Sequence, residues 1–176
     1  MIHEETPNYR LANLNDAPIL HTFAQKMFPD ATPSYIPQEA VQTFINEKLS
    51  QKIFEEYIRS EHYQVGILEK NKQPVGYTVL CTNTAENPEI VAEAACLSKF
   101  YLDPSVRGNG TAQKMMDAVC EQARQAGFTT LWLGTAKLNI RANKFYEKYG
   151  FRIVGERKFY LTQDIYGDDV IRRLNL

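Results

Sequence analysis

The sequence contains little cysteine and little histidine. Its three cysteines, Cys81, Cys96 and Cys120, are widely spaced among 176 residues and include no Cys-x-x-Cys pair. An odd number of scattered cysteines argues against a disulfide framework and against a zinc site. The three histidines also lack metal-ligand spacing. We therefore expect no bound metal, and a reducing cytoplasm is the simplest compartment for the chain.

An excess of charge of one sign is absent as well. The chain has 20 Lys and Arg against 21 Asp and Glu, which gives a formal net charge of -1. This balance argues against nucleic acid or an anionic membrane surface as a partner. No apolar run approaches the ~18 residues of a membrane span. The first ten residues are polar and acidic, whereas a signal peptide is basic and then apolar. We expect a soluble, cytoplasmic protein.

Apolar residues are abundant enough to form a core. They make up 44% of the chain, and a chain of this length buries about two thirds or more of its surface on folding. The sequence has no internal repeat, no low-complexity tract and no segment that resembles an interdomain linker. It therefore predicts a single domain over residues 1–176.

The spacing of apolar residues changes along the chain between the helical period and the strand period. Helices are predicted from 17 to 28, around 41–49 and 53–58, over 112–126 and over 139–149, with a proline-rich loop at 29–37. Strands are predicted at 9–14, 63–67, 75–81, 90–102, 129–133, 151–154, 159–161 and 170–176, with an acidic turn at 162–169. This pattern predicts an α+β fold.

A glycine-rich segment, Arg-Gly-Asn-Gly-Thr-Ala at 107–112, stands between a predicted strand and a predicted helix. Glycine permits positive φ and leaves no Cβ, so such a loop can turn its backbone N–H groups toward a phosphate. The helix that follows adds the positive end of its dipole. The glycines alone are equally compatible with a tight strand-to-helix turn that binds nothing.

Two segments together resemble the acetyl-CoA-binding signature of the GNAT superfamily of N-acetyltransferases. The first is Phe-Tyr-Leu-Asp-Pro followed by Arg-x-x-Gly-x-Ala, over 100–112. The second is Asn-x-x-Ala-x-x-Phe-Tyr-x-Lys-x-Gly-Phe, over 139–151. The strand Pro-Val-Gly-Tyr at 74–77 and the tail Phe-Tyr-Leu-x-x-Asp-x-x-x-Asp at 159–168 look most like the PaiA-type spermidine/spermine acetyltransferase branch. The resemblance implies a central, mostly antiparallel twisted sheet of about six to seven strands, flanked by helices.

The resemblance also assigns residues to acetyl-CoA, the implied cosubstrate. Backbone groups of one strand would pair with the pantetheine arm, the glycine-rich loop would hold the pyrophosphate, and one asparagine would contact the pantetheine. These residues are Phe100, Tyr101, Leu102, Arg107, Gly108, Asn109, Gly110, Thr111, Ala112, Asn139 and Lys148. Asn139 can equally be the N-cap of its helix, and Lys148 can equally be a solvated surface lysine.

Proton transfer requires an acid for the departing thiolate and a base for the amine. Tyr146 matches the family tyrosine near the sulfur of coenzyme A and is the candidate general acid, although an aromatic core residue would fit the same position. The family often carries a glutamate on the central strand, where this chain reads Ala-Cys-Leu-Ser-Lys at 95–99. Glu93 is the candidate base, or else an acid at the solvated end of a strand. Cys96 is more typical of a small buried residue than of a nucleophile.

The resulting hypothesis is an acetyl-CoA-dependent N-acetyltransferase. A primary amine, such as a polyamine, would attack the thioester directly in a ternary complex. Tyr35, Glu39 and Tyr160 are candidate residues for binding this small-molecule acceptor. Two alternatives stay open, namely a protein or peptide N-acetyltransferase and a non-catalytic coenzyme A-binding module. The sequence also leaves a homodimer open.

Overall fold

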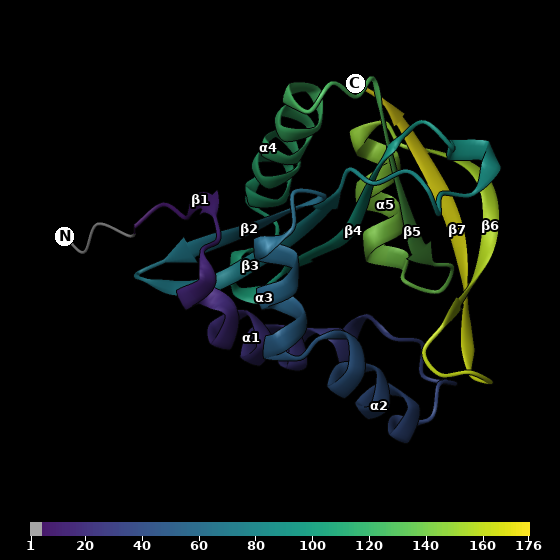
Figure 1. The fold of residues 1–176 in the computed structure, drawn as a ribbon, viewed down its shortest axis with the longest axis horizontal. Coiled ribbons are helices and arrows are strands. Elements are labelled where there is room, and N and C mark those ends of the chain that lie inside the picture. Colours follow the sequence, from purple (N-terminus) through teal and green to yellow (C-terminus); the bar gives the residue numbers. More distant parts are fainter. Residues whose placement is uncertain (1–4) are drawn as a thin grey trace.

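Segments rich in β-branched, aromatic and leucine side chains pair into one seven-stranded sheet in the computed structural model, which describes residues 5–176 (Figure 1). The strands are β1 (Asn8–Leu11), β2 (Tyr63–Lys70), β3 (Gln73–Cys81), β4 (Ala95–Leu102), β5 (Thr130–Ala136), β6 (Arg152–Tyr160) and β7 (Tyr166–Asn175). Their order across the sheet is β1-β2-β3-β4-β5-β7-β6, and only β4 and β5 run parallel. The predicted α+β fold with a mostly antiparallel sheet is confirmed.

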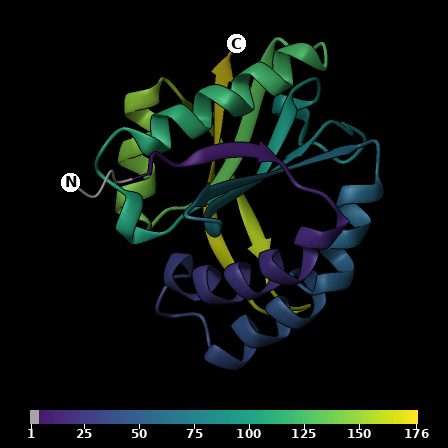
Figure 2. The same ribbon diagram turned by 90° about the vertical axis from the view of Figure 1, so that its left-hand side faces the viewer.

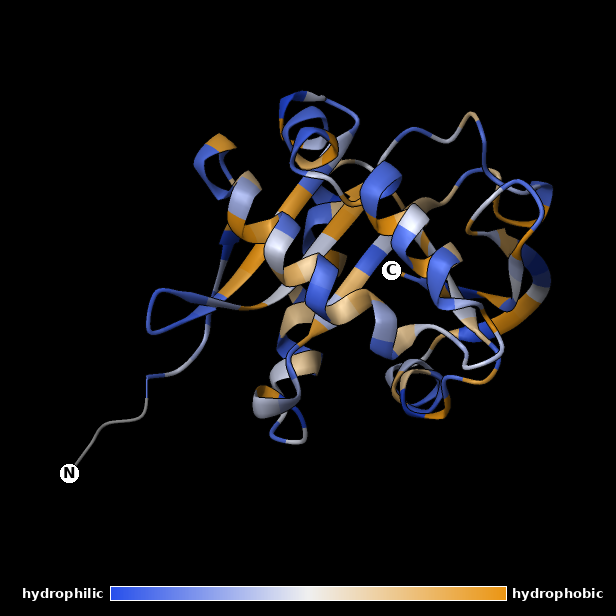
Figure 3. Ribbon diagram, turned by 90° about the horizontal axis from the view of Figure 1, so that it is seen from below, coloured by the Kyte–Doolittle hydropathy of each residue, from blue (hydrophilic) through white to orange (hydrophobic). Residues whose placement is uncertain are grey.

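Helices cover both faces of this sheet (Figure 2). The five α-helices are α1 (Ala17–Ala31), α2 (Gln38–Lys48), α3 (Gln51–Arg59), α4 (Thr111–Gln125) and α5 (Ile140–Tyr149), and the short 3-10 turns are η1 (Leu14–Asp16), η2 (Glu89–Val91) and η3 (Pro104–Val106). Helices α1 to α3 share one apolar core with β2 and β3, whereas α4 and α5 share another with β4 and β5. The strands between the helices are largely hydrophobic (Figure 3). None of the helices in 5–176 combines the length and apolar character needed to cross a membrane.

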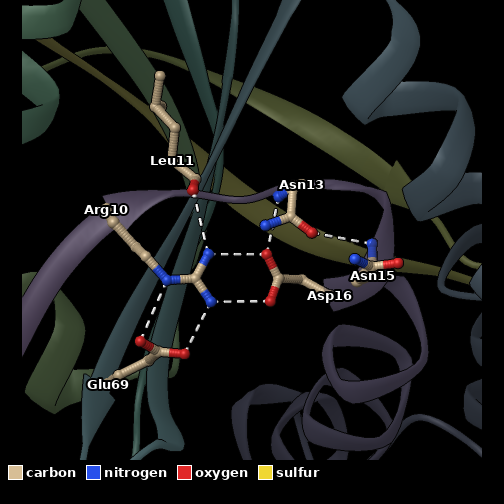
Figure 4. A network of polar contacts seen from close by, with 6 residues as sticks. All are labelled: Arg10, Leu11, Asn13, Asn15, Asp16 and Glu69. Carbon is tan, nitrogen blue, oxygen red and sulfur yellow. Dashed lines mark hydrogen bonds and ion pairs between the residues drawn. The ribbon is translucent and has the colours of Figure 1, made fainter.

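An arginine fastens the first strand to its neighbours (Figure 4). The Arg10 guanidinium on β1 donates to both carboxylate oxygens of Asp16 at 2.8 Å and to both oxygens of Glu69 at 3.1 and 2.7 Å. The backbone N–H of Asn13 also donates to Asp16, at 2.7 Å. Because Asp16 precedes α1 and Glu69 lies on β2, this network fixes α1 against the edge of the sheet.

The first helix is longer than predicted, because it continues through Pro29 to Ala31. A proline so near the end of a helix removes only one backbone hydrogen bond of the last turn. Burial of Phe28 compensates for this loss, since its ring stacks on Phe44 of α2 at 4.6 Å between centroids. The apolar stripe therefore overrides the local effect of the proline.

The central strand β4 is shorter than predicted, because the chain forms the turn η2 at residues where a strand was expected. The side-chain amide of Asn87 donates to the carbonyls of Val91, Ala92 and Ala94 at 3.1, 3.3 and 2.7 Å. Its oxygen accepts from the indole N–H of Trp132 at 3.1 Å. These bonds hold the segment in a compact turn, and β4 begins only at Ala95.

The C-terminal hairpin is more extended than predicted. Residues 151–154 and 159–161 were expected to be separate strands, but 152–160 form the continuous β6, with a bulge at Val154. Strand β7 begins at Tyr166 and not at Val170, so the connecting turn is short. The charged residues 156–158 concealed the alternating pattern of a strand in the sequence. One of them, Arg157, is accommodated in the sheet because it binds Asp169 of β7.

Candidate active site

Strands β4 and β5 separate in the middle of the sheet. They pair only at Ala95 with Leu131 and at Cys96 with Trp132, although β4 continues to Leu102. A gap therefore opens between the two strands beyond this short parallel ladder. Backbone groups that line such a gap are free to bind a ligand, because no neighbouring strand occupies their hydrogen bonds.

The register of β3 and β4 shows which peptide groups face this gap. The N–H of Asp103 donates to the carbonyl of Val75 at 2.8 Å. Because paired residues of antiparallel strands alternate between hydrogen-bonded and non-bonded positions, the peptide groups of Tyr101 face β3. Those of Phe100 and Leu102 face the gap. The expectation that three consecutive residues offer free backbone groups is therefore wrong for Tyr101, whose side chain stacks on Tyr77 instead.

Tyr146 projects from α5 into the aromatic core beside this gap. Its ring centroid lies 6.3 Å from that of Phe100 on β4 and 5.7 Å from that of Phe151. The ring is buried, but the hydroxyl forms no hydrogen bond with any residue from 5 to 176. Burial, with a smaller contribution from the Tyr101 phenol, raises the pKa of Tyr146 above its usual range. The hydroxyl therefore stays protonated and can donate a hydrogen bond.

The glycine-rich loop ends at an open helix N-terminus. Gly108 and Gly110 have φ of +80° and +84°, and a Cβ on either would meet no atom within 4 Å. The first helical bond of α4 runs from the N–H of Lys114 to Gly110, at 3.2 Å. Within the described chain, the N–H groups of Ala112 and Gln113 have no hydrogen-bond acceptor. Free N–H groups at a helix N-terminus bind phosphate, so this loop fits the diphosphate of coenzyme A.

The other residues expected to bind the cofactor have structural partners or lie on the surface. The Nε of Arg107 donates to the carbonyl of Leu102 at 2.9 Å, which ties the loop to the end of β4. Thr111 donates through its backbone N–H to Asn109 at 3.2 Å. The Asn139 side chain accepts from the N–H of Ala142 at 3.2 Å and is thus the N-cap of α5. Lys148 is exposed.

A cavity of about 120 Å³ lies on the α1–α3 side of the gap. Its lining residues come from α1, α2 and strands β4, β5 and β6, and they are Phe28, Phe44, Leu49, Cys96, Leu97, Ser98, Lys99, Tyr101, Gly134, Arg157 and Phe159. Two of these side chains, Lys99 and Arg157, are cationic. Burial lowers the pKa of Lys99 to about 8 and raises the pKa of Cys96 to about 12. A larger hollow of about 320 Å³ lies between α1 and α2, but no residue of β4 or β5 lines it.

Comparison with known proteins identifies the family. Residues 24–151 match the Acetyltransferase (GNAT) family, and this range includes β4, the glycine-rich loop and Tyr146. An uncharacterized N-acetyltransferase of Mycobacterium bovis is 32% identical over 160 residues, which are 91% of this chain and 98% of that protein. The chain belongs to the GNAT family. It is therefore an acetyl-CoA-dependent N-acetyltransferase, and acetyl-CoA is its cosubstrate.

Solved GNAT structures share the fold. The PaiA N-acetyltransferase of Thermoplasma acidophilum, in complex with coenzyme A, has a TM-score of 0.78 and 19% identity, covering 98% of this chain and 100% of that one. The ribosomal-protein-S18-alanine N-acetyltransferase of Escherichia coli has a TM-score of 0.67 and 20% identity, covering 97% and 94%. Identities this low establish a common architecture only.

The candidate base is placed away from the gap of this GNAT fold. Glu93 precedes β4 at the end where the strands are still paired, and its carboxylate forms an ion pair with Arg173 of β7 at 3.0 Å. Glu93 lies seven positions before Phe100. Because a strand rises about 3.3 Å per residue, the two residues are far apart along the direction of β4. This position fits the alternative interpretation, an acid at the solvated end of a strand. The placement argues against Glu93 as the base, so its assignment is withdrawn.

The three residues expected to bind the acceptor lie outside the cavity. Glu39 is exposed on the first turn of α2, and Tyr160 is exposed against the ring of Tyr166 at 5.3 Å. The hydroxyl of Tyr35 accepts from the N–H of Asp168 at 3.1 Å, which joins the loop after α1 to β7. The cavity residues that sequence reasoning missed are Lys99 and Arg157. The one signal of this cavity in the sequence is Gly134, because a glycine inside a strand often marks a place where another group approaches the backbone closely.

Proposed function

We propose that this GNAT enzyme transfers the acetyl group of acetyl-CoA directly to a primary amine in a ternary complex, within the gap between β4 and β5. The observation that carries the proposal is the unpaired Tyr146 hydroxyl beside this gap, together with the free N–H groups at the N-terminus of α4, a helix that packs in the same core as Tyr146. The cavity is lined by residues of β4 up to Tyr101, and the loop is bound to the next residue of the same strand, Leu102, so both substrates can bind at once.

The residue roles follow from this arrangement. The N–H groups at the start of α4 hold the diphosphate, and the gap-facing peptide groups of Phe100 and Leu102 bind the pantetheine and polarise the acetyl carbonyl. The Leu102 carbonyl is the exception, because Arg107 already binds it. The amine attacks the carbonyl carbon, a C–N bond forms, and the C–S bond breaks with its electron pair on sulfur. Tyr146 donates a hydrogen bond and then a proton to this thiolate.

The amine must lose a proton, and β4 supplies no carboxylate to accept it. Asp169, across the gap on β7, is already bound to Arg157, with Nε and Nη2 at 3.2 and 3.1 Å from its Oδ2. We therefore infer that the acceptor enters as the free amine and that the proton its nitrogen loses as the amide forms passes to water, from which the Tyr146 phenolate regains the proton it gave to sulfur. Turnover should accordingly increase with pH as the acceptor amine becomes neutral.

A polyamine acceptor and membership of the PaiA-type branch stay predictions. The likeness to PaiA is one of fold, and the cavity carries Lys99 and Arg157, which repel a polycation. An alanine of ribosomal protein S18 is the acceptor named for the Escherichia coli enzyme. The small volume of the cavity favours a small molecule or a single terminal residue over an extended peptide.

Release of coenzyme A thiol from acetyl-CoA tests the proposal. The panel contains a small alkylamine, α-amino acids, spermidine and a short peptide with a free N-terminus. Acceptor-dependent thiol release with at least one of them is expected, together with a matching N-acetylated product in mass spectrometry. Binding of acetyl-CoA in calorimetry without acetylation of any acceptor would favour the non-catalytic alternative.

A further inference from the structure

We propose that Lys99 and Arg157 form a subsite for a negative charge on the acceptor, so that the preferred acceptor is a small amine that carries a carboxylate, such as an α-amino acid. This inference rests on the proposed function, because it assigns the substrate class of the same gap. It replaces the expectation of a polyamine acceptor with that of an acceptor that carries a negative charge.

Arg157 is held in a fixed position on the cavity wall. Its guanidinium lies over the rings of Trp132 and Phe159, at 5.3 and 5.4 Å from their centroids, and binds Asp169 through Nε and Nη2. The absence of a side chain at Gly134 leaves the space that the guanidinium occupies. Within 5–176, Nη1 has no hydrogen-bond partner. An arginine fixed in this way offers a hydrogen-bond donor to a ligand, and binding of the ligand costs little further side-chain entropy.

Lys99 lies in the same cavity without a carboxylate partner among the described residues. Its ammonium lies 5.4 Å from the centre of the Tyr57 ring, and its one hydrogen bond is a long one of 3.4 Å to the Ser98 hydroxyl. A half-buried ammonium with such weak partners is stabilised when an anion approaches. This side chain therefore attracts the anionic end of a ligand.

The charges around the cavity do not cancel. Two cations, Lys99 and Arg157, face one carboxylate, that of Asp169, so the site keeps an excess of one positive charge. The other lining residues are uncharged, and none of them is a carboxylate. Low-dielectric walls strengthen the attraction of this charge for an anion and its repulsion of a polyamine.

The position of the cavity makes the subsite relevant to the reaction. Its lining residues come from β4, β5 and β6, which lie on both sides of the gap. Helix α4 and Tyr146 pack in the other core, on the opposite face of the sheet. A carboxylate held by Lys99 and Arg157 therefore anchors the acceptor from the α1–α3 side, with its amine free to enter the gap.

Matched acids and amides test the subsite, because the two members of a pair differ by one charge at nearly constant shape. Glycine, alanine and aspartate are compared with glycinamide, alaninamide and aspartic diamide, and spermidine represents the polyamines. Thiol release gives kcat/KM for each compound, and calorimetry on the protein saturated with coenzyme A gives each affinity without requiring turnover. For at least one pair, both kcat/KM and affinity should be about tenfold higher for the acid than for the amide, as expected for one charge-assisted contact.

Variants assign this preference to the cavity. Lys99→Met should abolish the acid-to-amide ratio, and Lys99→Arg should largely restore it. Lys158→Met is the control, because it removes the same charge from an exposed residue of β6, two positions after Glu156. The Lys158 ammonium lies over the ring of Tyr166, and its loss should leave the acid-to-amide ratio unchanged. Selective binding of acids without any turnover would refute the proposed function and keep the subsite. Turnover of amides or spermidine without preference for acids, or an equal effect of Lys99→Met on acids and amides, would overturn the subsite and keep the proposed function.

Discussion

The guanidinium of Arg157 occupies the space in which a side chain at Gly134 would have to lie. The two residues belong to β6 and β5, and β7 runs between them, so the arginine reaches across a whole strand. A Cβ built on Gly134 would overlap the Nη2, Cζ and Nε atoms of this guanidinium. The position of a cation in the cavity therefore depends on a glycine that is 23 residues away in the sequence.

Replacing Gly134 by alanine should displace Arg157 and weaken acceptor binding. We expect kcat/KM for a carboxylated acceptor to fall about tenfold, the value of one charge-assisted contact. The free energy of unfolding should fall by about 1–3 kcal/mol, as for other overpacked sites. The KM for acetyl-CoA should not change. Steady-state kinetics and urea unfolding measure both effects, and an unchanged acceptor kcat/KM would show that the arginine position does not matter.

Replacing Tyr146 by phenylalanine should reduce kcat about 100-fold, as is typical for loss of a proton donor. Stability should change by less than about 0.5 kcal/mol, because the hydroxyl has no hydrogen-bond partner in residues 5–176. Tyr149 on the same helix is the matched control, since its hydroxyl donates to Asp117. Tyr149→Phe should therefore lower stability and leave kcat unchanged. Equal kcat values for wild type and Tyr146→Phe, with chemistry rate-limiting, would contradict the acid role.

Gly110 and Gly127 allow backbone strain to be separated from cofactor binding. Their φ angles are +84° and +90°, and a Cβ on either meets no atom within 4 Å. Alanine at each position should cost a similar ~1 kcal/mol of stability. Only Gly110→Ala should weaken acetyl-CoA in calorimetry, by about tenfold, because only it alters the N–H groups that face the diphosphate. Equal affinities in the two variants would mean that the loop does not bind the cofactor.

The pH dependence of carboxylate binding should follow the charge of Lys99. Burial and the nearby Arg157 lower the pKa of this ammonium to about 8, against the opposing effect of the Cys96 and Cys81 thiols, while Tyr57 and Ser98 are its uncharged contacts. Affinity for an N-acetylated amino acid, which has no titrating amine, should therefore fall about tenfold as the pH rises through 8. In Lys99→Arg the fall should disappear, because arginine stays charged. A pH profile identical in both proteins would refute the assignment.

Much of the site could be predicted from local motifs, because residues close together in the sequence keep their spacing whatever the tertiary structure. The loop at 107–112 and the helix that carries Tyr146 lie where the sequence indicates. The cavity cations could not be found in this way. Lys99 and Arg157 are 58 positions apart, and only the strand order β4-β5-β7-β6, with the Arg157 side chain reaching across β7 to Gly134, brings them together. The start of β4 after Glu93 could not be predicted for a similar reason, since the bonds of Asn87 that shorten this strand involve a side chain outside the predicted strand.

Acid should destabilise the protein partly through Asp16. The hydrogen bonds from Arg10 lower the pKa of this carboxyl, against the opposing effect of burial. Its ionised form therefore contributes stability that is fully present above the unfolded-state pKa, near 4, and is lost as the pH falls through the lower folded-state value. Asp16→Asn should cost about 2 kcal/mol at pH 7, and this difference should shrink as the pH falls below 4. Glu121→Gln breaks the exposed pair with Arg124 and should cost less than about 0.5 kcal/mol at either pH. Urea unfolding between pH 7 and pH 3 measures these differences, and a pH-independent cost of Asp16→Asn would show that the Arg10 contact stabilises the fold without depending on charge.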